Sequence, residues 1–101
     1  TDLHIQNVNG PVFSLPITMD KMMALGISLE DCVEKVTASP AAIFSMEGLG
    51  KLKEGYTADI TVFHVEEGTY EYHDADGNDL TGHTSIRTDC AVVGGVVQMQ
   101  R

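Results

Sequence analysis

The pattern of apolar residues changes near the middle of the chain, and this change constrains the fold more than any other feature of the sequence. In the first half, apolar side chains recur at helical spacing, whereas from Thr57 onward they alternate with polar ones and include many aromatic and β-branched residues. These are the periods at which side chains return to the same face of a helix or a strand. The sequence therefore predicts an α+β fold, with helices first and a small antiparallel sheet second.

Three helices are expected in the first half, after an irregular loop over residues 3–16 that is rich in turn formers. The first helix is predicted to begin with a Thr18 cap and to end at Gly26. The second has the clearest start, since Ser28 is followed three residues later by an acid, as in a capping box. Its apolar residues form one stripe, at Leu29, Cys32, Val33 and Val36. A third helix is expected to begin near Pro40, because proline fits the first helical turn.

The second half is expected to form strands joined by turns. Residues 60–65 are a mostly apolar run, which suits a strand that is covered on both faces. The acid-rich segment 74–79 supplies turn chemistry after a short alternating stretch. Gly94-Gly95 is a two-residue turn signature between two apolar runs. Both turns predict hairpins.

Length, charge and cysteine content exclude several classes of protein. The 101 residues allow one domain at most, and 15 acidic against 6 basic residues give a formal charge of −9. This charge argues against nucleic-acid and membrane partners, which require clustered lysine and arginine. The chain shows neither an apolar run long enough to span a bilayer nor the pattern of a signal peptide. Cys32 and Cys90 make no disulfide framework, so we expect a cytoplasmic protein in which Cys32 packs as a small core residue.

The acids and the four histidines do not form a recognisable metal site. The spacing around Gly77 is not that of an EF-hand loop, so the acids of residues 66–79 are expected to lie on a solvated hairpin tip. No two histidines have the His-x-His or His-x-x-x-His spacing that preforms half of a zinc site. Asp2 and His4 stand close together ahead of a turn-rich loop, but their spacing alone points to no particular chemistry.

Four short segments give the sequence a more specific character. They are Thr1-Asp2-Leu3-His4, Gly10-Pro11-Val12 with Leu15-Pro16, Thr37-Ala38-Ser39-Pro40-Ala41, and Gly50-Lys51-Leu52-Lys53-Glu54-Gly55-Tyr56-Thr57-Ala58-Asp59-Ile60. In this order they resemble the C-terminal part of metal-dependent amidohydrolases, nearest to the dihydroorotase-like deacetylase branch, and the match covers nearly the whole chain. The residues agree physically with that resemblance. Gly50 and Gly55 allow a turn between helix and strand, and Asp59 is expected to be structural, bonding backbone amides at the strand entry.

The resemblance implies a place within a larger fold. Such enzymes have a (β/α)8 barrel and a small β-sandwich that is built from both ends of the chain. Residues 1–48 would then be the C-terminal end of the barrel, as a loop plus helices. Residues 49–101 would be the C-terminal part of the sandwich, and the barrel would be incomplete within this chain.

The resemblance also implies a chemistry. It is the hydrolysis of a small amide, such as a cyclic ureide or an N-acyl amino acid, with one or two divalent metals, usually zinc. Asp2 stands at the motif position of the aspartate that ligates a metal, takes a proton from water and passes it to the leaving nitrogen. Asp2 is therefore expected to be both catalytic and metal-binding. His4, Gly10 and Pro11 are expected beside the substrate.

The chain departs from the family pattern in most of the metal site. It has no His-x-His, no lysine identifiable as a carboxylated bridge and no later pair of histidine ligands, whereas zinc requires three or four protein ligands. Its beginning at Thr1 fits removal of an initiator methionine, and it also resembles a cut through a longer enzyme. We expect the isolated chain to be inactive and to hold no metal stably. We also expect it to self-associate or to need the missing N-terminal part, because apolar faces are left uncovered.

One alternative stays open at this point. The chain would then be a free-standing, non-catalytic acidic β-rich domain with an interaction or structural role. An upstream reading frame with His-x-His favours the hydrolase, and a start codon directly before Thr1 favours the free-standing domain.

Overall fold

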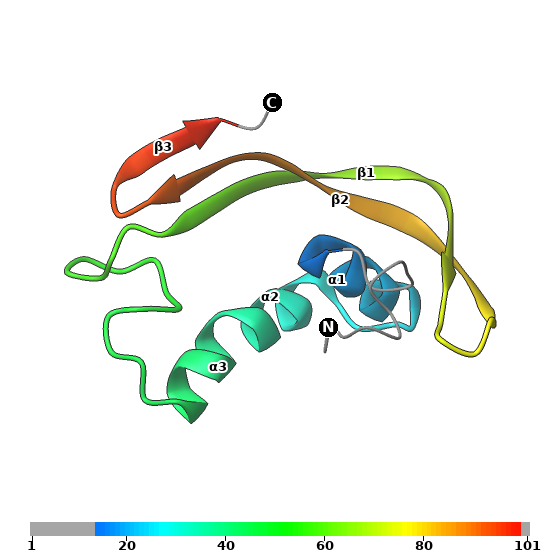
Figure 1. The fold of residues 1–101 in the computed structure, drawn as a ribbon, viewed down its shortest axis with the longest axis horizontal. Coiled ribbons are helices and arrows are strands. Elements are labelled where there is room, and N and C mark those ends of the chain that lie inside the picture. Colours follow the sequence, from blue (N-terminus) through cyan, green and yellow to red (C-terminus); the bar gives the residue numbers. More distant parts are fainter. Residues whose placement is uncertain (1–13, 100–101) are drawn as a thin grey trace. The chain divides into compact units, whose positions relative to one another are not determined.

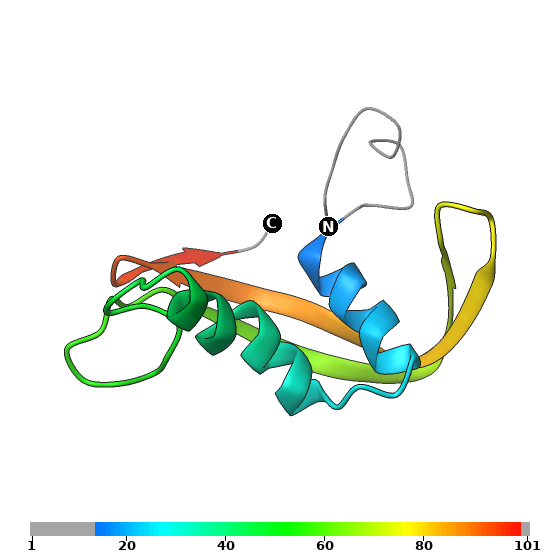
Figure 2. The same ribbon diagram turned by 90° about the horizontal axis from the view of Figure 1, so that it is seen from below.

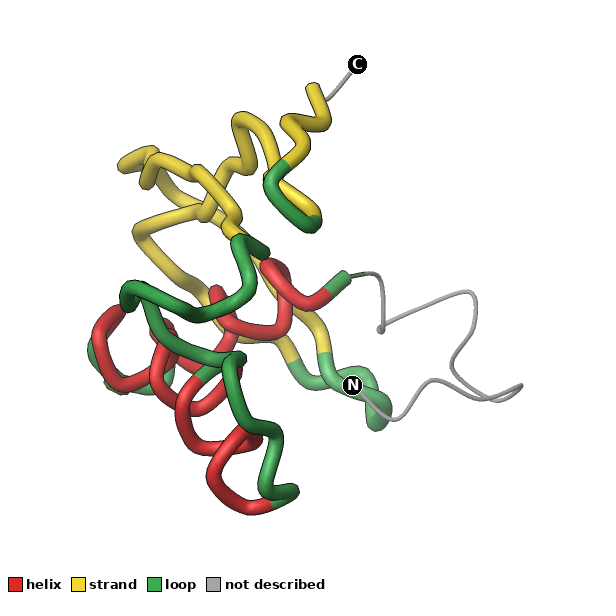
Figure 3. The backbone as a smooth tube through the Cα atoms, turned by 90° about the vertical axis from the view of Figure 1, so that its left-hand side faces the viewer, coloured by secondary structure: helices red, strands yellow, loops and turns green. Residues whose placement is uncertain are grey.

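Three helices precede a three-stranded sheet in the computed structural model, which describes residues 14–99 (Figure 1). The elements are α1 (Leu15–Ala24), α2 (Leu29–Val36), α3 (Ala38–Ile43), β1 (Ile60–His73), β2 (Asp79–Val93) and β3 (Val96–Met99). The strand order is β1-β2-β3, and each strand is joined to the next by a short turn, so neighbours run antiparallel. Figure 3 shows the same succession of helices and strands along the backbone. The predicted α+β class and the small antiparallel sheet are confirmed.

The described residues pack as two compact units, each built from two distant stretches of chain. The first unit combines residues 14–27 with residues 65–87, and the second combines residues 28–64 with residues 88–99. In the first unit α1 lies beside the part of the hairpin nearest the turn (Figure 2). In the second unit α2 and α3 pack on each other. The boundary expected between residues 48 and 49 concerns a barrel and a sandwich, and it stays a prediction.

Helix α1 begins earlier than expected. Its N-cap is Ser14, whose side-chain oxygen accepts a hydrogen bond from the Ile17 amide at 3.4 Å, and Pro16 sits in the first turn. The predicted start of this helix at Thr18 is wrong. The prediction that the preceding loop extends to residue 16 is wrong for the same reason, because Leu15 and Pro16 are already helical. Thr18 lies inside the helix and its hydroxyl donates back to the Ser14 carbonyl at 3.2 Å. Serine at the cap with proline just inside the helix is a favourable start, and it outweighs the turn propensity of the residues around it.

Helices α2 and α3 follow the predicted pattern more closely. Ser28 caps α2 by accepting from the Asp31 amide at 3.1 Å, and Cys32 is 3% exposed, as the stripe predicted. α3 begins at Ala38, two residues before Pro40, and ends at Ile43. Two residues after this end, Ser45 has a positive φ of 54°. The chain then returns to α3 at Gly50, where a Cβ would lie 2.7 Å from the Thr37 carbonyl oxygen. Only glycine fits so close an approach.

Strand β1 is longer than expected, and its apolar run is not covered on both faces. β1 runs for 14 residues as a single strand, where the sequence predicted a strand over 60–65 and a separate alternating stretch. The expectation that both faces are covered is wrong, because Val62 is 45% exposed while Phe63 and Val65 are half-buried. Both predicted hairpins are confirmed, one turning at 74–78 and one at Gly94-Gly95, where Val93 pairs with Val96.

Candidate functional site

The residues that the resemblance assigned to the catalytic site lie outside the described part of the chain. These residues are Asp2, His4, Gly10 and Pro11, and the structure describes residues 14–99. Their roles remain predictions. The described residues contain four other polar arrangements of interest, which are the strand-entry carboxylate, the cross-strand histidine pairs, the acidic hairpin tip and one buried carboxyl group.

The strand-entry carboxylate is Asp59. Its Oδ1 accepts a hydrogen bond from the Gly94 amide at 2.8 Å, and the neighbouring Ala58 carbonyl accepts one from the Gly95 amide at 3.0 Å. The residues before β1 are thereby tied to the turn between β2 and β3. The expectation that Asp59 bonds backbone amides at the strand entry is confirmed, and the geometry gives it a structural role.

Two histidines form cross-strand pairs with aspartates. His64 Nδ1 lies 2.9 Å from Asp89 Oδ1 in the second unit, and His73 Nδ1 lies 2.6 Å from Asp79 Oδ1 in the first. All four side chains are about half exposed or more, so each pair is screened by water. His83 lies in β2 and is exposed. Within the described residues the three histidines therefore act as ordinary strand residues.

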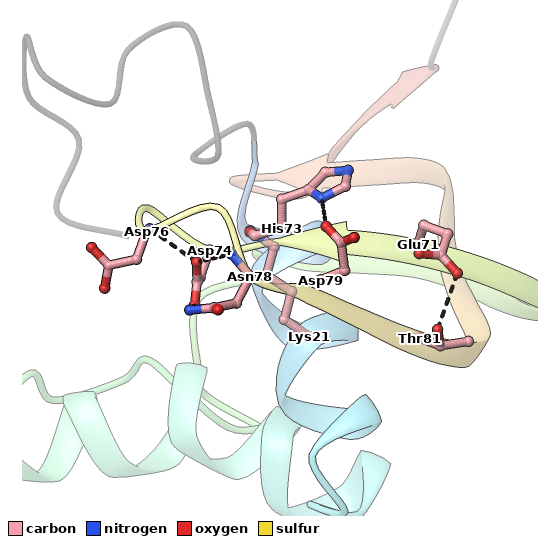
Figure 4. Close-up of polar contacts among 8 residues, drawn as sticks. All are labelled: Lys21, Glu71, His73, Asp74, Asp76, Asn78, Asp79 and Thr81. Carbon is pink, nitrogen blue, oxygen red and sulfur yellow. Dashed lines mark hydrogen bonds and ion pairs between the residues drawn. The ribbon is translucent and has the colours of Figure 1, made fainter.

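Hydrogen bonds to Asp74 organise the acidic hairpin tip (Figure 4). Its Oδ1 accepts from the Asp76 and Asn78 amides at 2.9 and 2.8 Å, and its Oδ2 accepts from Asn78 Nδ2 at 2.9 Å. These hydrogen bonds lower the pKa of Asp74, because they stabilise the ionised carboxylate. Nearby, Lys21 donates to the His73 carbonyl at 2.8 Å. The acids at the tip are exposed, as the sequence predicted.

The described residues do not fit a zinc site. Over residues 14–99 no group of three or more histidine, cysteine, aspartate or glutamate side chains is placed to hold a metal ion. A structural or catalytic zinc ion needs at least three such ligands. A zinc ion bound by this protein would therefore need at least one ligand from outside this range.

Sequence reasoning missed one chemically distinctive residue, Asp20. Its side chain is 2% exposed, and its Oδ1 accepts from the Ile86 amide at 2.9 Å. Burial raises the pKa of Asp20, although the bond from Ile86 and the charge of Arg87 oppose that rise. A signal did exist in the sequence, since Asp20 is the only acid in α1, whose other residues are apolar except for Thr18 and Lys21.

A small pocket lies in the second unit. Its volume is 140 Å³, and it is lined mostly by small and apolar side chains, namely Ala38, Ala41, Ala42, Met46, Leu49, Lys51 and Tyr56. Beside it the chain leaves three large apolar side chains open, with Ile43, Phe44 and Leu52 at 72–82% exposed. Exposed apolar side chains that lie together usually mark a surface that contacts another protein or another part of the same protein.

None of the described helices is long and apolar enough to cross a membrane.

Comparison with known proteins gives a consistent relationship. Residues 52–98 match the family model described as a deacetylase-like composite domain. The chain is 34% identical over 98 residues to a protein named deacetylase from Enterococcus faecalis, a match that covers 96% of this chain and 27% of that protein. The chain therefore spans about a quarter of the length of this relative.

Two solved structures share the fold of the chain. One, described as an adenine deaminase, superposes with a TM-score of 0.93 at 33% identity and covers 99% of this chain and 27% of that one. The other, described as a dihydroorotase, superposes with a TM-score of 0.85 at 31% identity and covers 98% of this chain and 27% of that one. Deacetylase, dihydroorotase and adenine deaminase are all members of one superfamily. The chain therefore belongs to the amidohydrolase superfamily.

Proposed function

We propose that the chain is the C-terminal segment of a metal-dependent amidohydrolase that hydrolyses a small amide, and that these 101 residues alone are inactive. The proposal rests on how unequally the match covers the two proteins. The aligned region includes 96% of this chain but only 27% of the Enterococcus faecalis deacetylase. The substrate class is that of the dihydroorotase-like or N-acyl amino acid deacetylase-like enzymes, a cyclic ureide or an acylated amino acid.

The segment is proposed to contribute two pieces to the longer enzyme. Residues 1–48 are the end of a (β/α)8 barrel, and the three helices α1, α2 and α3 support this assignment. Residues 49–101 are the C-terminal part of a composite β-sandwich, and the family match over residues 52–98 supports it. The barrel is incomplete in this chain.

Asp2 is proposed as the metal ligand and catalytic carboxylate of the longer enzyme, with His4, Gly10 and Pro11 beside the substrate. The metal is proposed to be a divalent cation, zinc in the first instance. Because the described residues do not fit a metal site, the other ligands are proposed to come from the part of the enzyme that precedes this segment. This assignment makes the 101 residues unable to hold the metal stably.

The proposed partner of this chain is the remainder of the enzyme. Ile43, Phe44 and Leu52 are 75%, 72% and 82% exposed, which supports a surface that needs covering. Without the remainder, the chain is proposed to self-associate through such apolar side chains. Cys32 and Cys90 are not joined by a disulfide, which supports the proposed cytoplasmic location.

The test is to express the longer reading frame and compare it with the 101-residue chain. We expect an open frame extending about 270 residues upstream, with a His-x-His motif, by analogy to barrel size. The longer protein is expected to bind zinc and to hydrolyse a cyclic ureide or an N-acetyl amino acid, with adenine as a third test substrate. Asp2→Asn is expected to abolish turnover, whereas Asp76→Asn on the exposed hairpin tip serves as the matched control.

A start codon directly before Thr1, with no upstream frame, would support the alternative of a free-standing, non-catalytic acidic domain. If the longer enzyme is active and its Asp2→Asn variant keeps full turnover and its zinc, the family assignment would stand. The proposed catalytic and metal-binding roles of Asp2 would then be wrong. Turnover of adenine alone would move the substrate class away from small amides.

A further inference from the structure

Helix α1 carries apolar side chains on nearly every side. Of its ten residues, seven are apolar or proline, and the exceptions are Thr18, Asp20 and Lys21. A helix that is apolar all round is typical of the interior of a larger fold, whereas a surface helix keeps one polar face. The directions of the two charged side chains of α1 therefore decide which face is left for a partner.

Both charged side chains of α1 bond to the β1–β2 hairpin of the same unit. Asp20 Oδ1 accepts a hydrogen bond from the Ile86 amide in β2 at 2.9 Å, and Lys21 Nζ donates to the His73 carbonyl in β1 at 2.8 Å. Asp20 is only 2% exposed. The charged side of α1 is therefore the side that lies on the hairpin (Figure 2), which reverses the usual arrangement of a surface helix.

Close packing at the end of α1 agrees with this orientation. A Cβ on Gly82 in β2 would lie 3.2 Å from the Ala24 methyl group. Asp20 and Ala24 are four residues apart, so they lie on the same face of the helix. The hairpin therefore occupies this face of α1.

The opposite face of α1 is apolar and open. Leu15, Met22 and Leu25, the last at the C-cap, are 48%, 39% and 65% exposed. At about 3.6 residues per turn they share the side of the helix that points away from Asp20. We call these three residues the outer face of α1. They belong to the first unit, whereas the open apolar side chains of residues 43–52 belong to the second.

We propose that the outer face of α1 is a docking surface for apolar, uncharged side chains of the enzyme segment that precedes this chain. The inference rests on the proposed function, which supplies the longer polypeptide. This chain covers 27% of the Enterococcus faecalis deacetylase and 27% of the adenine deaminase structure, whose superposition includes 99% of this chain. About three quarters of each relative lies outside the match, which is ample polypeptide to cover the second side of α1.

The size of the outer face favours a segment of the same polypeptide over a separate molecule. A ten-residue helix is about 15 Å long and about 10 Å wide, so one face offers far less than the roughly 800 Å² per partner that a stable interface between separate proteins buries. A connected segment docks on so small a surface because its effective concentration is high. A second copy of this chain lacks that advantage.

The test compares thiol labelling of a Leu25→Cys variant in the 101-residue chain and in the longer enzyme. Labelling is read at that position by peptide mass spectrometry, so that Cys32 and Cys90 do not interfere. We expect the longer enzyme to slow labelling at least about tenfold, because the covering segment must open before the thiol reacts. An Asp76→Cys variant at the exposed hairpin tip controls for the reactivity of the reagent, and each rate is divided by its rate.

Oxidation of Met22 by peroxide gives a second measurement that needs no substitution. Met22 is also expected to react at least about tenfold more slowly in the longer enzyme. Equal rates in the two proteins, at position 25 or at Met22, would overturn the proposal. Protection in the longer enzyme that disappears on dilution would assign the outer face to a second copy and would overturn it as well.

Zinc content and amide hydrolysis of the same longer protein separate this inference from the proposed function. A protected outer face in a longer protein without zinc or turnover would support the docking surface and contradict the proposed function. An open outer face in an active zinc enzyme would have the reverse meaning.

Discussion

The Asp59 carboxylate accepts a hydrogen bond of 2.8 Å from the backbone amide of Gly94, which lies thirty-five residues further along the chain. The bond ties the start of β1 to the turn between β2 and β3. Asp59 also belongs to the segment that most resembles amidohydrolases. The motif therefore fixes one corner of the sheet in this chain.

Replacing Asp59 by alanine should destabilise the second unit by roughly 1 kcal/mol, since the Gly94 amide loses its partner at an exposed site. Urea denaturation monitored by circular dichroism measures the change. Asp59→Asn retains an oxygen acceptor and should lose less than half as much. An alanine variant as stable as the parent chain would show that water replaces the carboxylate without cost.

Replacing Gly50 by alanine should be more damaging than replacing Gly55. Both glycines have φ near +85°, so both substitutions carry the backbone cost of roughly 1 kcal/mol. At Gly50 the new methyl group would also lie 2.7 Å from the Thr37 carbonyl and 2.8 Å from the Ala41 side chain, whereas at Gly55 it meets nothing within 4 Å. The added overpacking should cost about 1–3 kcal/mol.

Comparing Gly50→Ala with Gly55→Ala isolates the cost of the close contact at position 50, because both variants carry the same backbone cost of a positive φ. Thermal denaturation of the two variants under one buffer condition is sufficient. Equal melting temperatures would mean that α3 and the following loop move apart easily, and the packing described at Gly50 would be wrong.

Asp74 should make the hairpin tip less stable in acid. Its pKa is lowered by hydrogen bonds from Asn78, Asp76 and Gly77, so its contribution is present above 3.8 and is lost as the pH falls through the lower folded value. Amide exchange and chemical shifts of residues 74–78 should therefore change below about pH 4. Asp74→Ala should remove this transition, while Asp76→Asn should leave it in place. A transition unchanged in the Asp74 variant would assign it to another group.

Replacing Phe44 or Leu52 by serine should reduce self-association without lowering thermal stability. The two side chains are 72% and 82% exposed, so little buried area is lost on substitution. Light scattering over a range of concentrations measures the association, and Glu47→Ser provides a neighbouring exposed control. A parent chain that remains monomeric at all concentrations, or serine variants that associate as strongly, would remove these side chains from the interface.

Local chemistry made several parts of the fold predictable. Ser28 starts α2, segment 74–78 turns the long hairpin, and Gly94-Gly95 turns the short one, because each depends on residues that are neighbours in sequence. The role of Asp59 was also predictable from its position ahead of a strand. The predicted start of α1 was wrong because Ser14 and Thr18 could each cap a helix, and Ser14 does so in the structure.

The remaining features depend on contacts between distant residues. Asp20 is 2% exposed, and its carboxyl group accepts a hydrogen bond from the amide of Ile86, sixty-six positions away in the sequence. The length of β1 and the exposure of Val62 similarly depend on residues that are distant in the sequence. The catalytic assignment rests on Asp2, which lies outside the described residues and stays a prediction.

The central claim is that these residues form part of a longer metal-dependent enzyme and cannot work alone. The most direct measurement is the zinc content of the purified 101-residue chain, together with its hydrolysis of an N-acetyl amino acid and a cyclic ureide. The account predicts far less than one zinc ion per chain and no hydrolysis above buffer. One tightly held zinc ion per chain with turnover of either amide would contradict it.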